Sequence, residues 1–226
     1  KATDEELHES VSGYLDDGYA RVKIKIKPGR DIEMLAGLRE RFPDVAFMAD
    51  ANSAYTLDDV DRLKELDALD LMMIEQPFSY DDFLDHARLQ EQLSTPVCLD
   101  ESIKSEGDLA LAFELGSCQI VNIKPGRVGG FGVSRRLHDT ARDRDMPVWC
   151  GGMLESGVGR AYNVALASLP GFSLPGDISA SQRYWEQDIV TPEFEVEDGV
   201  MRVPSGVGLG VELDLDRIHG LTTREA

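Results

Sequence analysis

Short apolar segments alternate with amphipathic segments along most of the chain. The apolar segments are rich in β-branched residues and predict strands, whereas the longer segments between them predict helices. The predicted strands are ARVKIKI, VAFMA, LMMIE, VCLD, QIVNIK, PVWC and FSLPG, and the predicted helices cover residues 4–17, 31–41, 57–67, 81–93, 104–115, 131–144 and 157–168. Strands that alternate with helices of this length indicate parallel βαβ units in an α/β fold.

A polar residue closes each of the first predicted strands at a nearly constant interval. These residues are Lys25, Asp50, Glu75, Asp100 and Lys124, separated by 25, 25, 25 and 24 residues. Gly151 and Asp177 continue the series after 27 and 26 residues. A repeated unit of this length predicts a TIM-type (β/α) barrel, in which successive strand ends form a ring at the C-terminal mouth. We therefore expect the five charged side chains to converge.

The two ends of the chain depart from the repeat. Counting backwards, a strand before the first helix would have ended near residue 0, so we expect the first barrel strand to lie outside this chain. After Asp177 the pattern lapses into a loop-rich stretch with one hairpin-like pair around Glu197-Asp198-Gly199. We predict a barrel domain over residues 1–178 and a C-terminal tail over residues 179–226 that packs on the barrel and on another module.

Composition narrows the partners and the compartment. Lys and Arg number 23 against 42 Asp and Glu, a net charge of −19, which disfavours nucleic acid and anionic membranes. Adaptation to high salt is an alternative reason for this acidity. The three cysteines contain no Cys-x-x-Cys pair, and no segment reaches the roughly 20 apolar residues of a membrane span. The chain also opens on a charged segment rather than an apolar export signal, so we expect a cytoplasmic protein.

Three of the strand-end residues are carboxylates, Asp50, Glu75 and Asp100. One such residue alone is more often a helix cap. Three in register would repel one another across the mouth, and a cation resolves that repulsion. Hard carboxylate oxygens with positions left for water or substrate suit Mg²⁺, with Mn²⁺ as a substitute.

Lysines alternate with isoleucines before the first strand end. Lys23, Lys25 and Lys27 enclose Ile24 and Ile26, a pattern that an edge strand with solvent-facing lysines would also show. In a closed barrel the same pattern sends the isoleucines under the helices and the lysines inward. A lysine buried beside a metal and another lysine has its charged form disfavoured, so we assign Lys25 as a proton acceptor.

Lys124 falls roughly opposite Lys25 in the predicted ring. Two lysines on opposite sides of a metal-bound carboxylate can reach both faces of its α-carbon, and the metal would stabilise the enediolate. A Schiff-base lysine, as in barrel aldolases, is the alternative for Lys124.

The remaining candidate groups receive no catalytic assignment. The four histidines fall on predicted helices or in the tail, and Cys150 is interpreted as a packed thiol. The glycines of KPGRVGG and WCGGMLESGVG can cradle a phosphate, let backbone approach an anionic substrate, or form tight turns.

Several motifs together resemble the enolase superfamily. They are VKIKIKPG, MADANSAYTL, MIEQP, CLDESI and VNIKPGRVGG, and the WCGGMLESGVG and LPGDISAS segments are similar to the o-succinylbenzoate synthase and N-acylamino acid racemase group. The resemblance implies that the fold is the enolase C-terminal barrel, that Asp50, Glu75 and Asp100 ligate Mg²⁺, and that Lys25 and Lys124 are catalytic. It also implies substrate contacts by Lys23, Asn52, Gly152 and Met153, with Asn52 supporting the metal site. Family members carry an N-terminal capping domain, which we do not find in this chain.

The resemblance implies a first functional hypothesis and several alternatives. The first is dehydration to o-succinylbenzoate, a step toward menaquinone. Racemisation of N-succinylamino acids, and more distantly dipeptide epimerisation or muconate cycloisomerisation, need the same proton abstraction. A non-catalytic barrel scaffold is the alternative outside the enzymes. We expect a small-molecule carboxylate substrate and a homo-oligomer.

Overall fold

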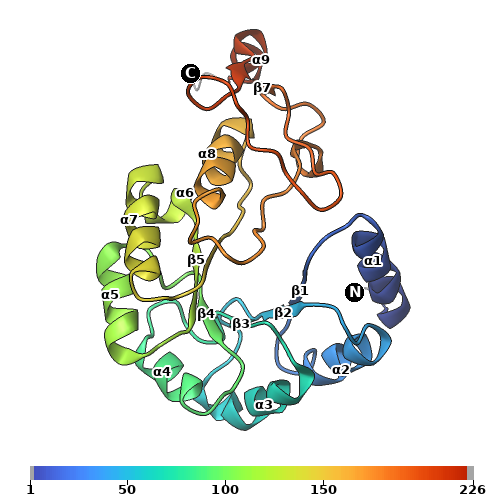
Figure 1. Cartoon of the computed structure of the whole chain (residues 1–226). Helices are drawn as coiled ribbons and strands as arrows, with labels where there is room; N and C mark the ends of the chain where they lie inside the picture. Colours follow the sequence, from blue (N-terminus) through green and yellow to red (C-terminus); the bar gives the residue numbers. More distant parts are fainter. Residues whose placement is uncertain (1–2, 223–226) are drawn as a thin grey trace.

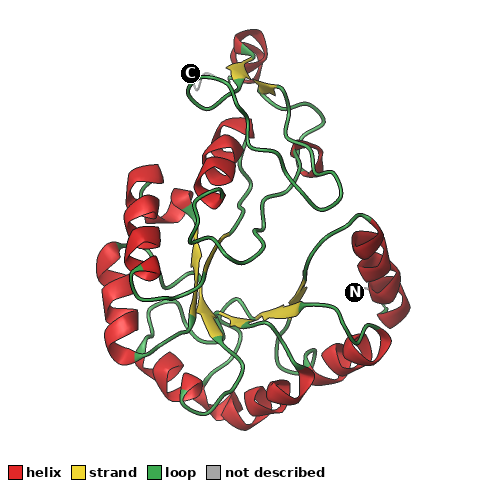
Figure 2. Cartoon of the chain, viewed as in Figure 1, coloured by secondary structure: helices red, strands yellow, loops and turns green. Residues whose placement is uncertain are grey.

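A curved parallel sheet of six strands lies at the centre of the molecule (Figure 1; Figure 2). The computed structural model describes residues 3–222. The strands pair in chain order, and they are β1 (Val22–Lys25), β2 (Phe47–Asp50), β3 (Ile74–Glu75), β4 (Val97–Leu99), β5 (Ile120–Ile123) and β6 (Val148–Cys150). This sequential parallel order is that of a partial (β/α) barrel, so the predicted fold class is confirmed.

Helices follow the strands of the sheet and lie on its convex side (Figure 1). They are α2 (Ile32–Arg41), α3 (Val60–Glu65) flanked by the short 3-10 helices η1 (Leu57–Asp59) and η2 (Leu66–Leu69), α4 (Leu84–Gln90), α5 (Glu106–Leu115), α7 (Phe131–Arg142) and α8 (Gly157–Ala167). α1 (Asp4–Asp16) precedes β1 and begins at a capping box, in which the Thr3 side chain accepts from Glu6 N and the Glu6 carboxylate accepts from Thr3 N. All seven predicted helices are therefore present, with some ends shifted by one to three residues.

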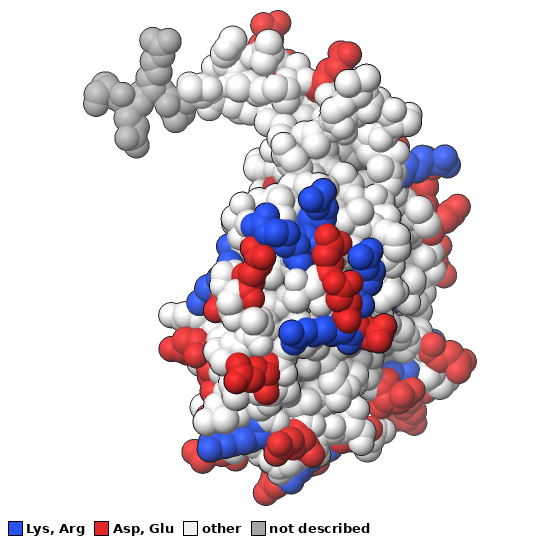
Figure 3. All heavy atoms as spheres, turned by 60° about the vertical axis from the view of Figure 1, so that its left-hand side comes forward, with Lys and Arg blue, Asp and Glu red and all other residues white. Residues whose placement is uncertain are grey.

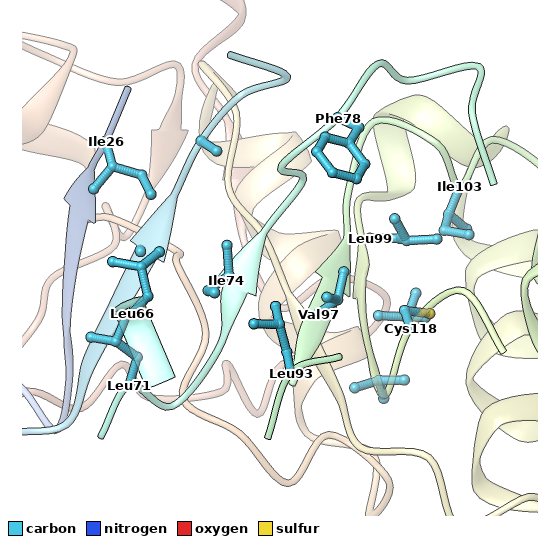
Figure 4. Close-up of a cluster of buried hydrophobic side chains, with 14 of the residues drawn as sticks. Ile26, Leu66, Leu71, Ile74, Phe78, Leu93, Val97, Leu99, Ile103 and Cys118 are labelled. Carbon is cyan, nitrogen blue, oxygen red and sulfur yellow. The ribbon is translucent and has the colours of Figure 1, made fainter. Parts of the chain in front are cut away.

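Alternation along the strands separates two apolar layers. One set of strand residues packs under the helices in an outer core, where Ile26, Ile74, Val97 and Leu99 lie beside helical and loop residues such as Leu66 (Figure 4). The residues of opposite parity form a separate inner core of Met48, Met73, Cys98, Ile120 and Trp149. Because strand side chains alternate between faces, the charged strand-end residues share the inner face with this second cluster.

Two local predictions differ from the structure. The predicted strand FSLPG is not a strand; only a single parallel bridge joins Gly151 to Asp177. Pro175 within this segment has no backbone N–H to donate to a ladder, and Phe172 instead stacks on His138 with ring centroids 5.2 Å apart. The second difference is a short helix α6 (Pro125–Val128) directly after Lys124, which the sequence pattern did not reveal.

The tail after Asp177 packs on α8. It contains η3 (Ser181–Arg183), an antiparallel pair of β7 (Val190–Thr191) and β8 (Glu212–Leu213), and α9 (Leu215–Leu221). Val190 and Phe194 are buried against Ala161 and Val164 of α8. An antiparallel bridge between Glu197 and Val200 forms the hairpin-like turn expected there. The division between residues 178 and 179 stays a prediction.

A buried polar network fixes this tail to the start of α8. The Asp188 carboxylate accepts from the backbone N–H groups of Gly157 and Ile189, each at 2.7 Å, from Ser181 Oγ at 2.6 Å and from Arg160 Nη1 at 3.2 Å. Asp188 and Arg160 are both buried, so the ion pair depends on these hydrogen bonds to offset its desolvation.

The surface carries charges of both signs. Figure 3 shows Asp and Glu side chains interspersed with Lys and Arg side chains on one face of the molecule. Within residues 3–222, no helix combines the length and apolar character needed to cross a membrane.

Candidate active site at the strand ends

The structure brings the predicted strand-end residues together in one row. Lys25 lies opposite Asp50 in the β1–β2 register, and Asp50 lies opposite Glu75 in the β2–β3 register. Asp100 and Lys124 directly follow β4 and β5, the next two strands in the sheet. Asp50, Glu75 and Asp100 are all buried. The two lysines therefore flank three neighbouring carboxylates in strand order.

Lys25 is held by two acceptors from the β2 strand end. Its Nζ donates to Asp50 Oδ2 at 2.6 Å and to Asn52 Oδ1 at 2.5 Å. The Lys25 side chain is 61% exposed, so the expected burial of this lysine is wrong for the described chain. The reason is that Lys25 is the last residue of β1, where the side chain extends beyond the inner core rather than into it.

Lys124 and Arg127 both engage Asp100. Lys124 Nζ donates to Asp100 Oδ2 at 2.8 Å, and Arg127 donates to both carboxylate oxygens and, at 2.7 Å, to the Asp100 backbone oxygen. Burial alone would raise the pKa of the Asp100 carboxyl, but the Arg127 hydrogen bond and the Lys124 charge hold it below its ordinary value. Asp100 therefore stays ionised.

Glu75 lies between the two aspartates and is the least compensated of the three. Asn122 Nδ2 donates to Oε1 at 2.8 Å, whereas Oε2 accepts no hydrogen bond from the described residues and has Lys23 Nζ at 3.8 Å. Burial and the neighbouring charges of Asp50 and Asp100 raise the pKa of Glu75 to about 8. A positive charge at this position would offset both causes.

Lys23 lies on the inner face of the sheet, two residues before Lys25 in β1. Its Nζ pairs with Asp177 and lies 3.5 Å from Asp50 Oδ2, so it connects the end of β2 to Asp177. Burial opposes its charge, but Glu75 and Asp177 raise the pKa of Lys23 above its ordinary value. Lys23 is therefore a fixed cation. Below it, Arg21 stacks over Trp149, with Cζ 4.3 Å from the ring centroid.

The carboxylates face cations rather than a common point. Among residues 3–222, no three side chains of Asp, Glu, His or Cys are gathered closely enough to ligate one ion. Instead, Asp50 is engaged by Lys25, and Asp100 by Lys124 and Arg127. The donor set still fits Mg²⁺, because three buried carboxylates on adjacent strands are hard oxygen ligands and Glu75 Oε2 lacks a hydrogen-bond donor.

Two glycines let the next strand end approach the site closely. A Cβ on Gly151 would lie 2.3 Å from Asn122 Oδ1 and 2.5 Å from Lys124 Cε, and a Cβ on Gly152 would lie 2.0 Å from the Asp177 backbone oxygen. Glycine is therefore required at both positions by close packing against other residues of the protein, and approach to an anionic substrate stays a prediction. Met153, predicted to contact substrate, is 48% exposed.

A cavity of about 480 Å³ opens beside these groups. Lys23, Lys25, Asp50, Lys124 and Gly152 line it on the barrel side. Tyr14, Tyr184 and Arg183 line it on the other side, so α1 and the tail both contribute to its wall. The cavity gives a small anionic molecule access to both lysines.

Three polar residues at the site were absent from the sequence prediction. Asn122 and Arg127 contact Glu75 and Asp100 as described above, and Gln76 connects two loops. Gln76 Oε1 accepts from the backbone N–H groups of Asp100 at 3.0 Å and Ser102 at 3.2 Å. Strand alternation could have indicated Asn122, because it lies two residues before Lys124 and so on the same face of the sheet. No sequence pattern indicated the contacts of Gln76, since they depend on its positive φ of 42°.

The histidines and Cys150 lie outside this row, as predicted. His8, His86, His138 and His219 fall in α1, α4, α7 and α9. His86 Nε2 accepts from Phe78 N, and burial lowers the pKa of His86. Cys150 belongs to the outer core, and burial raises the pKa of its thiol to about 12, consistent with a packed thiol.

Known proteins match the chain along nearly its whole length. The family model "Enolase C-terminal domain-like" matches residues 6–217. An o-succinylbenzoate synthase of Geobacillus kaustophilus is 54% identical over 220 residues, covering 97% of this chain and 59% of the relative. An N-succinylamino acid racemase of Amycolatopsis sp is 54% identical over 219 residues, covering 96% of this chain and 59% of the relative.

Solved structures agree with this assignment. A member of the enolase superfamily from Listeria innocua superposes with a TM-score of 0.96 at 49% identity, covering 99% of this chain and 60% of that structure. The chain thus spans about three fifths of the length of the relatives that it matches.

Proposed function

Because the chain belongs to the family of enolase C-terminal-like domains, we propose that the whole protein removes the α-proton of a small carboxylate substrate at this row of strand-end residues. One observation carries the proposal: Lys25 and Lys124 flank three buried carboxylates and both line the same cavity. Two amines on either side of a bound carboxylate provide a proton acceptor for one face of its α-carbon and a cation or second acceptor for the other.

Lys25 takes the α-proton in this proposal. Asp50 Oδ2 and Asn52 Oδ1 hold its Nζ in place, and the exposed side chain can reach a substrate in the cavity. Lys124 acts from the other side. In dehydration the charge of Lys124 stabilises the anion that proton removal forms, and Lys25 passes the proton to the departing β-hydroxyl group, which leaves as water. In racemisation Lys124 returns a proton to the opposite face.

Asp50, Glu75 and Asp100 would hold Mg²⁺, or Mn²⁺ in its place. Bound there, the ion supplies positive charge that favours the ionised carboxylates and the anionic form of the substrate. Lys23, Gly152 and Met153 complete the substrate side in this proposal: Lys23 contributes a fixed charge, Gly152 lines the cavity, and Met153 would contact the substrate.

Dehydration to o-succinylbenzoate, a step toward menaquinone, is the first candidate reaction. It is supported by the synthase relative, whose identity over this chain is 54%. Racemisation of N-succinylamino acids is the second candidate, favoured by an equal identity of 54% to the racemase relative and by the presence of a lysine on each side of the row.

The setting that we propose follows from the same features. The substrate is a small molecule, and the mixed, predominantly acidic surface disfavours nucleic acid and anionic membranes. A cytoplasmic homo-oligomer is proposed for the whole protein, and light scattering after size exclusion measures its oligomeric state.

Two parallel assays test the proposal in the whole protein with Mg²⁺. One measures loss of water from the synthase substrate, and the other follows exchange of the α-proton of N-succinylamino acids in D₂O by NMR. Turnover in either assay supports α-proton removal, and the ratio of kcat/KM values ranks the two reactions. Inactivity in both would overturn the proposal and favour a non-catalytic scaffold.

A further inference from the structure

Asn52 is held from two sides by groups of opposite hydrogen-bonding type. Its Oδ1 accepts from Lys25 Nζ at 2.5 Å, and its Nδ2 donates to Glu101 Oε1 at 3.0 Å. The lysine ammonium only donates, and the neutral amine that takes the α-proton must keep its lone pair toward the substrate, so in both forms Lys25 presents an N–H to Asn52; a carboxylate only accepts. The two neighbours therefore allow one orientation of the Asn52 amide, with its oxygen toward Lys25.

The backbone around Asn52 is fixed by short-range and cross-strand hydrogen bonds. Asn52 N donates to Asp50 Oδ1 at 3.2 Å, and Ser53 N donates to the Gln76 backbone oxygen at 2.8 Å. Asn52 and Ser53 both adopt positive φ angles, 42° and 63°, in the left-handed region that asparagine tolerates better than most residues. The loop thus presents the amide at a defined place, and only its rotation about the side-chain bond is left to be set.

Glu101 is itself anchored on the other side of the row. It follows Asp100, whose backbone N–H donates to the buried Gln76 side chain and whose carboxylate is held by Arg127. Glu101 Oε1 is directed at Asn52, and Oε2 is buried without a hydrogen-bond donor among the described residues. Within residues 3–222, the hydrogen bond to Asn52 is thus the one that the structure gives the Glu101 carboxylate.

We propose that Glu101 is a positioning residue that acts through Asn52 on Lys25. By accepting from Nδ2, Glu101 keeps Oδ1 facing an N–H of Lys25, so that the lone pair of the neutral Nζ stays directed at the substrate. The inference rests on the proposed role of Lys25 in α-proton removal.

Loss of the Glu101 acceptor has a specific consequence. The Asn52 amide can then turn its NH₂ group toward Lys25, where two donors face each other and the contact is lost. Asp50 Oδ2 remains as the other acceptor of Lys25, so the lysine stays nearby but is less well aligned. Because its long side chain is largely exposed, packing does not restore the alignment. The chemical step slows, while substrate binding changes little.

The test compares variants of Glu101 in the whole protein with Mg²⁺, with kcat and KM measured for α-proton exchange. Glu101→Met removes both oxygens at similar volume and is expected to lower kcat by about 10- to 100-fold, the range found when outer partners of site residues are removed. KM should stay within about twofold, because binding groups are untouched. Glu101→Gln keeps an oxygen for Asn52 Nδ2 and should retain most of kcat. Glu106→Gln, on the exposed start of α5, is the matched control and should resemble wild type.

A double-mutant cycle separates the relay from other effects. If Glu101 acts through Asn52, adding Glu101→Met to Asn52→Ala lowers kcat no further than Asn52→Ala alone. Mg²⁺ affinity, measured by calorimetric titration, and the thermal unfolding midpoint should be unchanged in Glu101→Gln. Glu101→Ala replaces the methionine variant if that variant does not fold.

Three results would overturn the relay: an unchanged kcat in Glu101→Met, a glutamine variant as slow as the methionine variant, or independent losses in the double mutant. An inactive wild-type protein would instead overturn the proposed function, so the two failures are distinguishable.

Discussion

Lys25 and Lys124 lie at the same end of the sheet but are restrained in different ways. The Lys25 side chain is 61% exposed, whereas the Lys124 side chain is 12% exposed. Each donates to the strand-end aspartate nearest to it, Asp50 at 2.6 Å or Asp100 at 2.8 Å. The Asp100 side adds Arg127, three residues after Lys124 in the short helix α6. The Lys25 side instead depends on Asn52 and Glu101, which come from two other loops.

The comparison shows that the two lysines are positioned by different kinds of contact. Lys124 shares the Asp100 carboxylate with Arg127, a second cation from its own strand-to-helix segment. Lys25 is positioned by contacts between residues 27 and 49 positions apart in the chain. We therefore expect the Lys25 side to be more sensitive to changes in distant loops, and the predictions below test this asymmetry.

Removal of each lysine in turn should have the largest effect. In the exchange assay, Lys25→Ala should abolish α-proton exchange of one enantiomer of an N-succinylamino acid, and Lys124→Ala that of the other. The loss is expected to be about 10²- to 10⁴-fold, the usual contribution of a general base. Lys27→Ala, on the exposed continuation of β1, should leave both rates unchanged. Equal loss of both enantiomers in each variant would contradict a division of labour between the two sides.

Glu75 lies between the Lys25 side and the Lys124 side, and its substitution should weaken binding of the Mg²⁺ ion that the three carboxylates would share. Glu75→Gln removes one of three carboxylates, and we expect the affinity to fall by more than about tenfold, since loss of even an outer partner costs about 10- to 100-fold. Calorimetric titration measures the change. Glu106→Gln serves again as the control, and an unaffected titration would count against the three-carboxylate site.

In excess chelator, where no metal is bound, the same substitution should raise the stability of the protein. The pKa of Glu75 is raised from 4.5 to about 8, so the folded state binds its proton more tightly than the unfolded state. This contribution to stability is present below about pH 4.5 and is lost as the pH rises toward 8. Without metal, Glu75→Gln should therefore have a higher unfolding midpoint than wild type, by a margin that grows from pH 5 to pH 8. A constant margin would show that the burial of this carboxylate is not the cause.

The smallest expected effect is on stability, through the loops that follow β1 and β2. Tyr55 Oη donates to the buried Asp31 carboxylate at 2.8 Å, and Arg62 Nε donates to the same oxygen at 2.7 Å. Tyr55→Phe should lower the free energy of unfolding by about 0.5–1.5 kcal/mol, measured by urea denaturation. Tyr80→Phe, at a tyrosine that is 52% exposed, should lower it by much less. Equal effects would indicate that this network does not stabilise the Lys25 side.

Much of the fold followed from strand parity and spacing. The alternation of Lys23, Ile24, Lys25 and Ile26 predicted which side chains enter the outer core, and the interval of 24 or 25 residues predicted which strand ends are neighbours. Both signals are periodic, so each position is supported by many others. The strand predicted at FSLPG failed because apolar composition does not reveal that a proline removes the ladder donor.

The site was less predictable than the fold. Residue type and register identified the lysines and carboxylates, but the exposure of Lys25 depends on how far its side chain extends beyond the inner core. The contacts of Gln76 and Glu101 depend on loop geometry that has no period in the sequence. Arg127 reaches Asp100 from α6, a single helical turn that amphipathic patterning does not detect.

The Asp188 network has a consequence for how the molecule opens. Since one carboxylate accepts from the α8 start and from the tail, neither part can loosen without leaving a buried charge unsatisfied. The amide protons of Gly157 and Ile189 should therefore become accessible together, in one cooperative fluctuation. The part of the cavity wall that the tail forms would then open and close together with α8, the helix on which the tail packs.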